Sequence, residues 1–136
     1  MKTIDQSIVD AVSGDCTRAC IASLFEIELD TIPNFITFGR DWFIPFWNYI
    51  KNSGYDFHGT GFPKTRMLSE SPNINGFVMA SVPSRTFKDV GHSVVMDLKG
   101  LIVHDPNPNR KWQNVNVLES GDLQHWIMIS KAAGIV

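Results

Sequence analysis

The sequence predicts an α+β fold in which helices precede an antiparallel β-sheet. Two observations lead to this prediction. Helical periodicity dominates the chain up to Ser53, and short β-type segments separated by turns dominate the remainder. Helices that precede strands, rather than alternate with them, favour antiparallel pairing. The length of 136 residues fits a single domain, and no repeat or linker divides residues 1–136.

Two segments carry the helical pattern. The first is predicted over residues 15–29, with Asp15 as its N-cap and Cys16 in its first turn. The second is predicted over residues 41–53, where Gly54 is placed to end it in a left-handed conformation. An aromatic face on this helix is expected to be core, with a substrate wall or partner surface as the alternative; it comprises Trp42, Phe43, Phe46 and Trp47.

Short strands fill the second half of the chain. Tyr55 to His58 is predicted to be extended, and His58 to Pro63 to be a loop, because it contains two glycines and a proline. Further strands are predicted at residues 77–82, 92–98, 101–105, 115–118 and 126–130. The turn residues Lys99 and Gly100 join two of these strands into a hairpin.

The turn predicts the register of that hairpin. If Lys99 and Gly100 alone form it, Val94 faces Asp105. One face then holds His92, Val94, Met96, Val103 and Asp105, and the other holds Ser93, Val95, Asp97, Ile102 and His104. Asp105 becomes a diagonal neighbour of His92, within reach of a carboxylate–imidazole hydrogen bond. His104 points away and is expected on the surface or on the second face.

Composition argues against several classes of function. Twelve Lys and Arg against 14 Asp and Glu give a net charge of −2 without a basic run, which argues against nucleic-acid binding. No apolar stretch approaches the ~20 residues that span a bilayer, so no membrane association is expected. Two cysteines without a visible secretory signal predict a cytoplasmic protein without disulfides. The spacing of cysteines and histidines matches no zinc motif, and neither a metal nor a cofactor is expected.

Cys16 is the candidate nucleophile. At the start of a helix, the positive end of the macrodipole favours its thiolate form. Cys20 lies one turn further along among apolar residues, where burial raises the pKa of a thiol, so we assign it to the core. The alternative for Cys16 is a small buried side chain without chemistry.

His92 and Asp105 complete a candidate catalytic triad. In such a triad Cys16 attacks a carbonyl carbon, His92 moves the proton to the leaving group, and Asp105 orients the imidazole. The backbone N–H of Cys16 is a natural donor to the oxyanion. Gln6 and Ser13 are the nearest polar side chains upstream, and neither is assigned as the second donor.

At these residues the sequence resembles the papain-like cysteine peptidase superfamily, especially small bacterial and phage proteins related to bacteriocin-leader-processing peptidases and NlpC-type hydrolases. The matching segments are residues 14–24, 32–35, 91–95 and 103–106. The resemblance implies a papain-like fold, with the cysteine-bearing helix packed on the antiparallel sheet that holds the histidine and the acid. It also implies a bacterial or phage protein acting on a peptide or protein substrate, such as a host protein. One position departs from the family: its oxyanion glutamine, six residues before the cysteine, is Asp10 here, and an ionised carboxylate cannot donate.

Three functions remain open. We favour a cysteine-dependent acyl-transfer enzyme that uses Cys16, His92 and Asp105 to hydrolyse a peptide or isopeptide-type amide bond. A transglutaminase-like or deamidase-like acyl transferase is the alternative form of this first function, because it would use the same triad with another acceptor. The second function is a papain-like binding module in which Cys16 is inert, and the third is an interaction protein that uses an aromatic patch containing Trp47.

Overall fold

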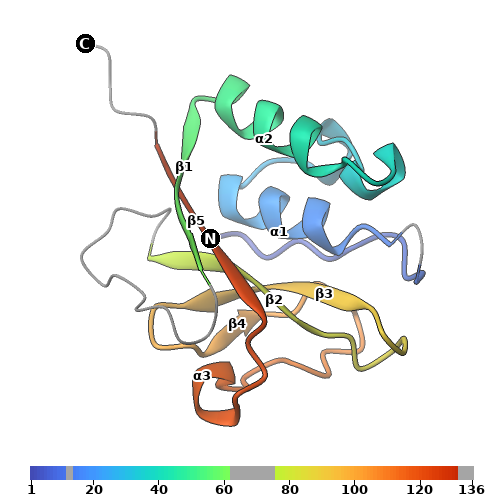
Figure 1. Ribbon diagram of the computed structural model, residues 1–136, viewed down its shortest axis with the longest axis vertical. Coiled ribbons are helices and arrows are strands. Elements are labelled where there is room, and N and C mark those ends of the chain that lie inside the picture. Colours follow the sequence, from blue (N-terminus) through green and yellow to red (C-terminus); the bar gives the residue numbers. More distant parts are fainter. Residues whose placement is uncertain (12–13, 62–75, 132–136) are drawn as a thin grey trace.

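The computed structural model describes residues 1–11, 14–61 and 76–131. Helices α1 (Cys16–Phe25) and α2 (Phe43–Asn52) lie on one side of a five-stranded sheet (Figure 1). The strands are β1 (Tyr55–Gly61), β2 (Phe77–Pro83), β3 (Gly91–Asp97), β4 (Ile102–His104) and β5 (His125–Lys131). Their order is β1-β5-β2-β3-β4 and every neighbouring pair is antiparallel. The predicted α+β class with an antiparallel sheet is therefore confirmed.

Both predicted helices exist, with shorter bounds. α1 ends at Phe25 because Glu26 adopts a left-handed conformation with φ of 58°, so the predicted end at Leu29 was wrong. Leu29–Thr31 forms a separate 3-10 turn, η1, and a second one, η2, spans Phe35–Phe38. α2 ends where Gly54 turns left-handed with φ of 86°, as predicted.

Two strand predictions were wrong. β1 begins at Tyr55 but continues to Gly61, so the loop predicted from His58 onward is paired with β5 up to that glycine. The rest of that predicted loop, residues 62–63, lies outside the described residues. The strand predicted at 115–118 is replaced by the short helix α3 (Val117–Ser120), because the Asn116 side chain caps it by accepting two backbone N–H groups.

The β3–β4 hairpin follows the predicted register only at the end away from its turn. Val95 pairs with His104 as predicted, but a bulge moves Met96 opposite Ile102. The turn is wider than two residues because the Asp97 carboxylate accepts the N–H groups of Lys99 and Leu101, at 2.8 and 3.0 Å. Ile102 consequently packs in the same core cluster as Val94 and Met96, whereas Val103 packs on the opposite side, which reverses the predicted faces of these two residues.

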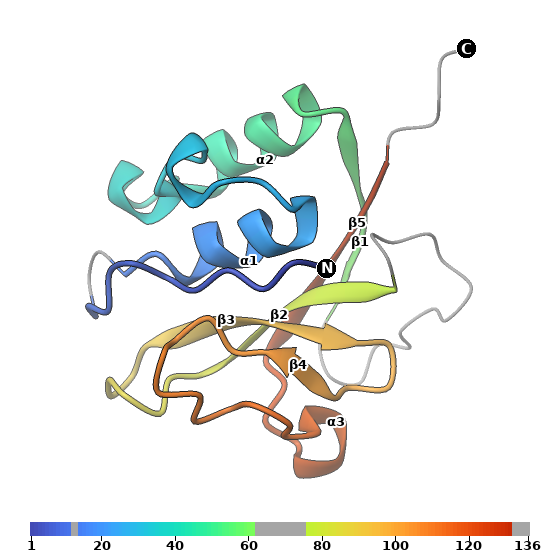
Figure 2. The ribbon, with the colours of Figure 1, turned by 180° about the vertical axis from the view of Figure 1, so that it is seen from behind.

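Apolar side chains cover both faces of the sheet. Figure 2 shows α1 and α2 over one face and α3 on the opposite side. The cluster facing α1 and α2 includes Ile21, Leu24, Phe46, Met79, Val95 and Ile129. The cluster on the other face includes Val78, Val94, Met96, Ile102, Trp112 and Val117. α1 packs mainly on β3, which brings the start of that helix next to the start of that strand.

Among the described residues, no helix has the length and apolar character needed to cross a bilayer.

His104 is on the second face of the hairpin, as expected, but it is buried rather than at the surface. Its Nε2–H donates to the carbonyl of Ile4 at 2.8 Å, which ties the N-terminal segment to β4.

Candidate active site

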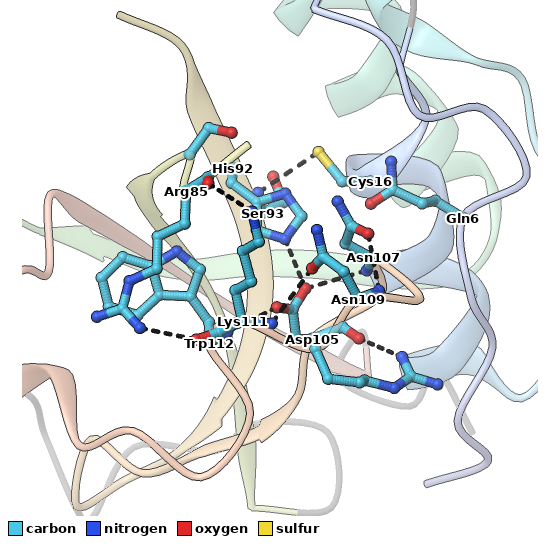
Figure 3. Close-up of polar contacts among 12 residues, drawn as sticks. Gln6, Cys16, Arg85, His92, Ser93, Asp105, Asn107, Asn109, Lys111 and Trp112 are labelled. Atoms are coloured by element: carbon cyan, nitrogen blue, oxygen red, sulfur yellow. Dashed lines mark hydrogen bonds and ion pairs between the residues drawn. The ribbon is translucent and has the colours of Figure 1, made fainter. Parts of the chain in front are cut away.

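Cys16, His92 and Asp105 converge at one edge of the sheet (Figure 3). Cys16 is the first residue of α1, His92 is the second residue of β3, and Asp105 directly follows β4. His92 Nε2 lies 2.6 Å from Asp105 Oδ1, and Cys16 and His92 line the same two cavities and interact electrostatically. The Sγ atom of Cys16 also accepts the backbone N–H of Ser93 at 3.5 Å. The three residues singled out from the sequence therefore lie together in one site, where His92 is bonded to Asp105 and interacts electrostatically with Cys16.

Asp105 is held as an ionised, immobile carboxylate. Its side chain is 1% exposed, and it accepts the N–H groups of Asn107 and Trp112 at 3.0 and 2.9 Å in addition to the imidazole. Burial opposes ionisation, but these donors and the charge of His92 outweigh it and lower the pKa of Asp105. The sequence reasoning missed Trp112, whose donor is a backbone group that no side-chain pattern reveals.

The electrostatics favour an ion pair between sulfur and imidazole. Partial burial disfavours the Cys16 thiolate, but its electrostatic interaction with His92 and the N–H of Ser93 together lower the pKa of the thiol. Burial likewise disfavours the imidazolium, but Asp105 and Cys16 raise the pKa of His92 to about 9. Because Nε2 is engaged by Asp105, Nδ1 is the nitrogen left to face sulfur.

Cys20 has the opposite character. It is fully buried, and burial together with the nearby charges of Cys16 and Asp105 raises the pKa of its thiol well above the ordinary value. The structure therefore places Cys20 in the core, as expected from the sequence, and the two cysteines differ sharply in their readiness to ionise.

A clamp of three side chains, formed by Arg85, Lys111 and Trp112, supports Asp105 from outside. The guanidinium of Arg85 lies 3.5 Å from the centre of the Trp112 ring and donates to the carbonyl of Lys111 at 2.7 Å. Lys111 donates in return to the carbonyl of Arg85 at 3.0 Å, and the Trp112 indole N–H donates to Pro83 at 2.9 Å. The clamp joins the β2–β3 loop to the segment that carries the N–H bound by Asp105.

Gln6 lies beside Cys16, on the N-terminal segment (Figure 3). Its backbone N–H donates to Pro106 at 2.9 Å and its Nε2 donates to the carbonyl of Ile8 at 2.8 Å. A carboxamide nitrogen carries two hydrogens, so a second donor remains on Nε2. The Oε1 atom is buried and has no hydrogen-bond partner among the described residues. Gln6 was named from the sequence without a role, and Ser13 lies outside the described residues.

The fully buried Asp15 fixes the path of that N-terminal segment. Its carboxylate accepts the N–H of Ile8 and the hydroxyl of Ser7, both at 2.8 Å, and pairs with Arg18 at 2.7 Å. Arg18 is thus neutralised by Asp15. Gly14 permits the close approach of this segment to α1, since a Cβ there would lie 2.5 Å from the carbonyl oxygen of Asp10.

Two cavities meet at Cys16 and His92. One has a volume of about 350 Å³ and the other about 80 Å³, and both residues line each of them. Gln6 and Asp10 both line the smaller cavity, so the position that departs from the resemblance lies in the same cavity as a carboxamide side chain. No group of three or more His, Cys, Asp or Glu residues suited to a metal occurs in the described part of the chain.

The aromatic residues of α2 divide between core and cavity. Phe46 is fully buried, as expected for a core residue. Trp42 and Phe43 are half-buried and line the larger cavity, whereas Trp47 is 39% exposed, so the expectation of core was wrong for Trp47.

Comparison with protein-family models, with curated proteins and with solved structures finds no match to this chain.

Proposed function

We propose that this chain is a cysteine-dependent acyl-transfer enzyme with a papain-like arrangement, which hydrolyses a peptide or isopeptide-type amide bond. The observation that carries the proposal is the convergence of Cys16 with the hydrogen-bonded pair of His92 and Asp105, with the pKa of the thiol lowered and that of the imidazole raised to about 9. Such a pair supplies a nucleophile and a general acid at neutral pH.

The reaction begins with acylation. The Cys16 thiolate attacks the carbonyl carbon, and the electron pair of the C=O bond moves onto oxygen. The imidazolium of His92 protonates the leaving nitrogen, the C–N bond breaks, and an amine leaves behind a thioester on sulfur. Water then attacks the thioester and gives a proton to neutral His92, after which the C–S bond breaks. A carboxylic acid leaves and the ion pair is restored.

The oxyanion requires two donors in this proposal. The backbone N–H of Cys16, at the start of α1, is one of them. The second is the remaining N–H of Gln6, whose carboxamide is already oriented by its bond to Ile8. A glutamine ten positions before the cysteine thus takes the role that Asp10, six positions before it, cannot fill.

Alkylation by iodoacetamide across a range of pH, followed by intact-protein mass spectrometry, tests the nucleophile. We expect half-maximal alkylation of Cys16 well below pH ~8.5, the value of an ordinary thiol, and a return to that value in His92→Ala. Cys20→Ala should match the wild type, and Cys16→Ala should not be labelled. An ordinary profile that His92→Ala leaves unchanged would favour the inert binding module.

Acyl transfer is tested separately with 4-nitrophenyl acetate. We expect an acetyl group on Cys16 that is lost as acetate, and no such adduct in Cys16→Ala. Addition of a primary amine distinguishes the two kinds of acceptor, because a transferase diverts the acetyl group to the amine whereas a hydrolase continues to release acetate. A thiol that ionises readily but never becomes acylated would contradict the proposed reaction.

A further inference from the structure

Apart from the ion pair of Cys16 and His92, the larger cavity has an uncharged lining. Its residues come from η2, from the start of α2, and from β2, β3 and β5, so it extends from the sulfur toward the aromatic end of α2. Its apolar side chains are those of Ile36, Trp42, Phe43, Met79, Val90 and Ile127. Among the described residues, no Asp, Glu, Lys or Arg contributes to the lining.

The polar groups of the lining are few and already bonded within the protein. The Thr17 and Ser93 hydroxyls lie 3.0 Å apart, and the Ser81 hydroxyl donates to Gln124 at 3.3 Å. His125 is also in the lining, and burial lowers the pKa of its imidazole, so this side chain adds no cation to the cavity near neutral pH. Because the charges of Cys16 and His92 already compensate each other, a carboxylate or ammonium group in this space would lose its hydration without gaining a countercharge of its own.

The volume is large enough for a bulky side chain. About 350 Å³ lies within the range of sites that enclose small organic groups, roughly 300–1,000 Å³. The smaller cavity contrasts with it in both size and chemistry, because it holds about 80 Å³ and includes Gln6, Asp10 and Asn107. The two sides of the sulfur are therefore built for groups of different kinds.

We infer that the larger cavity is a specificity site for an uncharged, bulky apolar side chain, aromatic or branched aliphatic, next to the bond that Cys16 attacks. This inference rests on the proposed function and narrows its substrate class to apolar stretches of polypeptide. Amides flanked by carboxylates or amines are excluded from this site by the cost of burying their charge. Glycine, which fills little of the cavity, is a poor occupant.

Iodoacetamides with different substituents on the amide nitrogen test this inference without a known substrate. The thiolate forms a C–S bond while the C–I bond breaks and iodide leaves, so the chemistry is the same across the series. Burial of each methylene group is worth roughly a fourfold gain in rate at most. We expect N-butyl and N-benzyl iodoacetamide to alkylate Cys16 about tenfold faster than the parent reagent, and the N-carboxymethyl reagent to be slower than the parent.

Val90→Asp places a charge in the lining at a half-exposed position, and Ile44→Asp places one on α2 outside the lining. Each rate is divided by the rate with parent iodoacetamide, which cancels any change in the reactivity of the sulfur. We expect Val90→Asp to abolish the preference for butyl and benzyl groups and Ile44→Asp to preserve it. Thermal melting confirms that both variants are folded.

The outcomes separate this inference from the proposed function. Rapid, His92-dependent alkylation by the parent reagent with no preference among substituents would overturn the specificity site and leave the proposed function standing. Slow, His92-independent alkylation by every reagent would overturn both. A preference for butyl and benzyl groups that survives in Val90→Asp would place the apolar site elsewhere and would also contradict the inference.

Discussion

The Nε2 atom of His92 lies 2.6 Å from Oδ1 of Asp105, across a separation of 13 residues in the sequence. The antiparallel pairing of β3 with β4 accounts for this proximity, because Val95 opposite His104 brings the start of one strand to the end of the other. The same contact occupies Nε2 and leaves Nδ1 available to Cys16, and Asp105 and Cys16 together raise the pKa of the imidazole to about 9.

The first prediction concerns the pH dependence of acylation by 4-nitrophenyl acetate. Because the pKa of Cys16 is lowered, the rate should rise at a pH below the ordinary value of a thiol. It should fall again as the imidazolium of His92 loses its proton at about pH 9. Asp105→Asn removes the carboxylate that raises the pKa of His92, so the falling limb should move to lower pH. A falling limb that stays in place in this variant would contradict the assignment.

The second prediction concerns the oxyanion. Gln6→Ala should slow acylation by about a hundredfold, the typical cost of losing one oxyanion donor. The pH profile of iodoacetamide alkylation should change little, because alkylation forms no oxyanion. Gln6→Glu is the matched control for side-chain size, and it should be as slow as the alanine variant because an ionised carboxylate cannot donate. Near-normal acylation rates in both variants would remove Gln6 from the mechanism.

The third prediction concerns the buried ion pair of Asp15 with Arg18. Asp15→Asn should lower the free energy of unfolding by about 3 kcal/mol, because it leaves a largely buried guanidinium without its countercharge. The half-exposed pair Lys51–Asp56 is the control, and Lys51→Met should change stability by about 0.5 kcal/mol or less. Urea denaturation measures both.

The same pair has a defined pH dependence. Hydrogen bonds to Ile8, Arg18 and Ser7 overcome burial and lower the pKa of Asp15 below its ordinary 3.8. A depressed carboxyl pKa contributes stability that is complete above the pKa of the unfolded chain and is lost as pH falls through that of the folded chain. The stability gap between wild type and Asp15→Asn should therefore narrow as pH falls below 3.8. A gap that is constant down to acid denaturation would argue against an ionised Asp15.

The fourth prediction concerns the clamp. Arg85→Ala should cost about 1 kcal/mol of stability through loss of the cation–π contact with Trp112. It should also move the alkylation profile of Cys16 to higher pH, because the Trp112 N–H that holds Asp105 becomes less firmly placed. Arg85→Lys should have intermediate effects on stability and on the alkylation profile, since it keeps the positive charge but loses the planar guanidinium group. Arg40→Ala, at an exposed position on the surface, should leave the alkylation profile unchanged.

The sequence was informative where one local rule determined the structure. The proximity of His92 and Asp105 followed from strand alternation and a glycine-containing turn, and the bulge next to Met96 did not disturb it because it falls nearer the turn. The bulge itself depends on the Asp97 side chain, which captures two N–H groups and widens the turn. A pattern of apolar and polar residues carries no trace of that bond, so the faces of Ile102 and Val103 were reversed.

The position of Gln6 next to Cys16 could not be predicted from local sequence patterns, for a different reason. Gln6 lies in a segment without helix or strand. The N–H of Ile4 donates to Ser23, the carbonyl of Ile4 accepts from His104, and the N–H of Gln6 donates to the carbonyl of Pro106. These partners are far away in the sequence, and the segment also depends on the contacts of Asp15. Only tertiary structure brings the carboxamide to the sulfur.

This dependence on distant partners has a consequence for the order in which the protein matures on the ribosome. Gln6 and Cys16 are made early, whereas His92, Asp105 and the carbonyl of Pro106 leave the exit tunnel much later. Because chains emerge from the N-terminus onward, the nascent chain carries an unactivated thiol until the hairpin is complete. The contacts that lower the pKa of the Cys16 thiol therefore form only after most of the polypeptide has been translated.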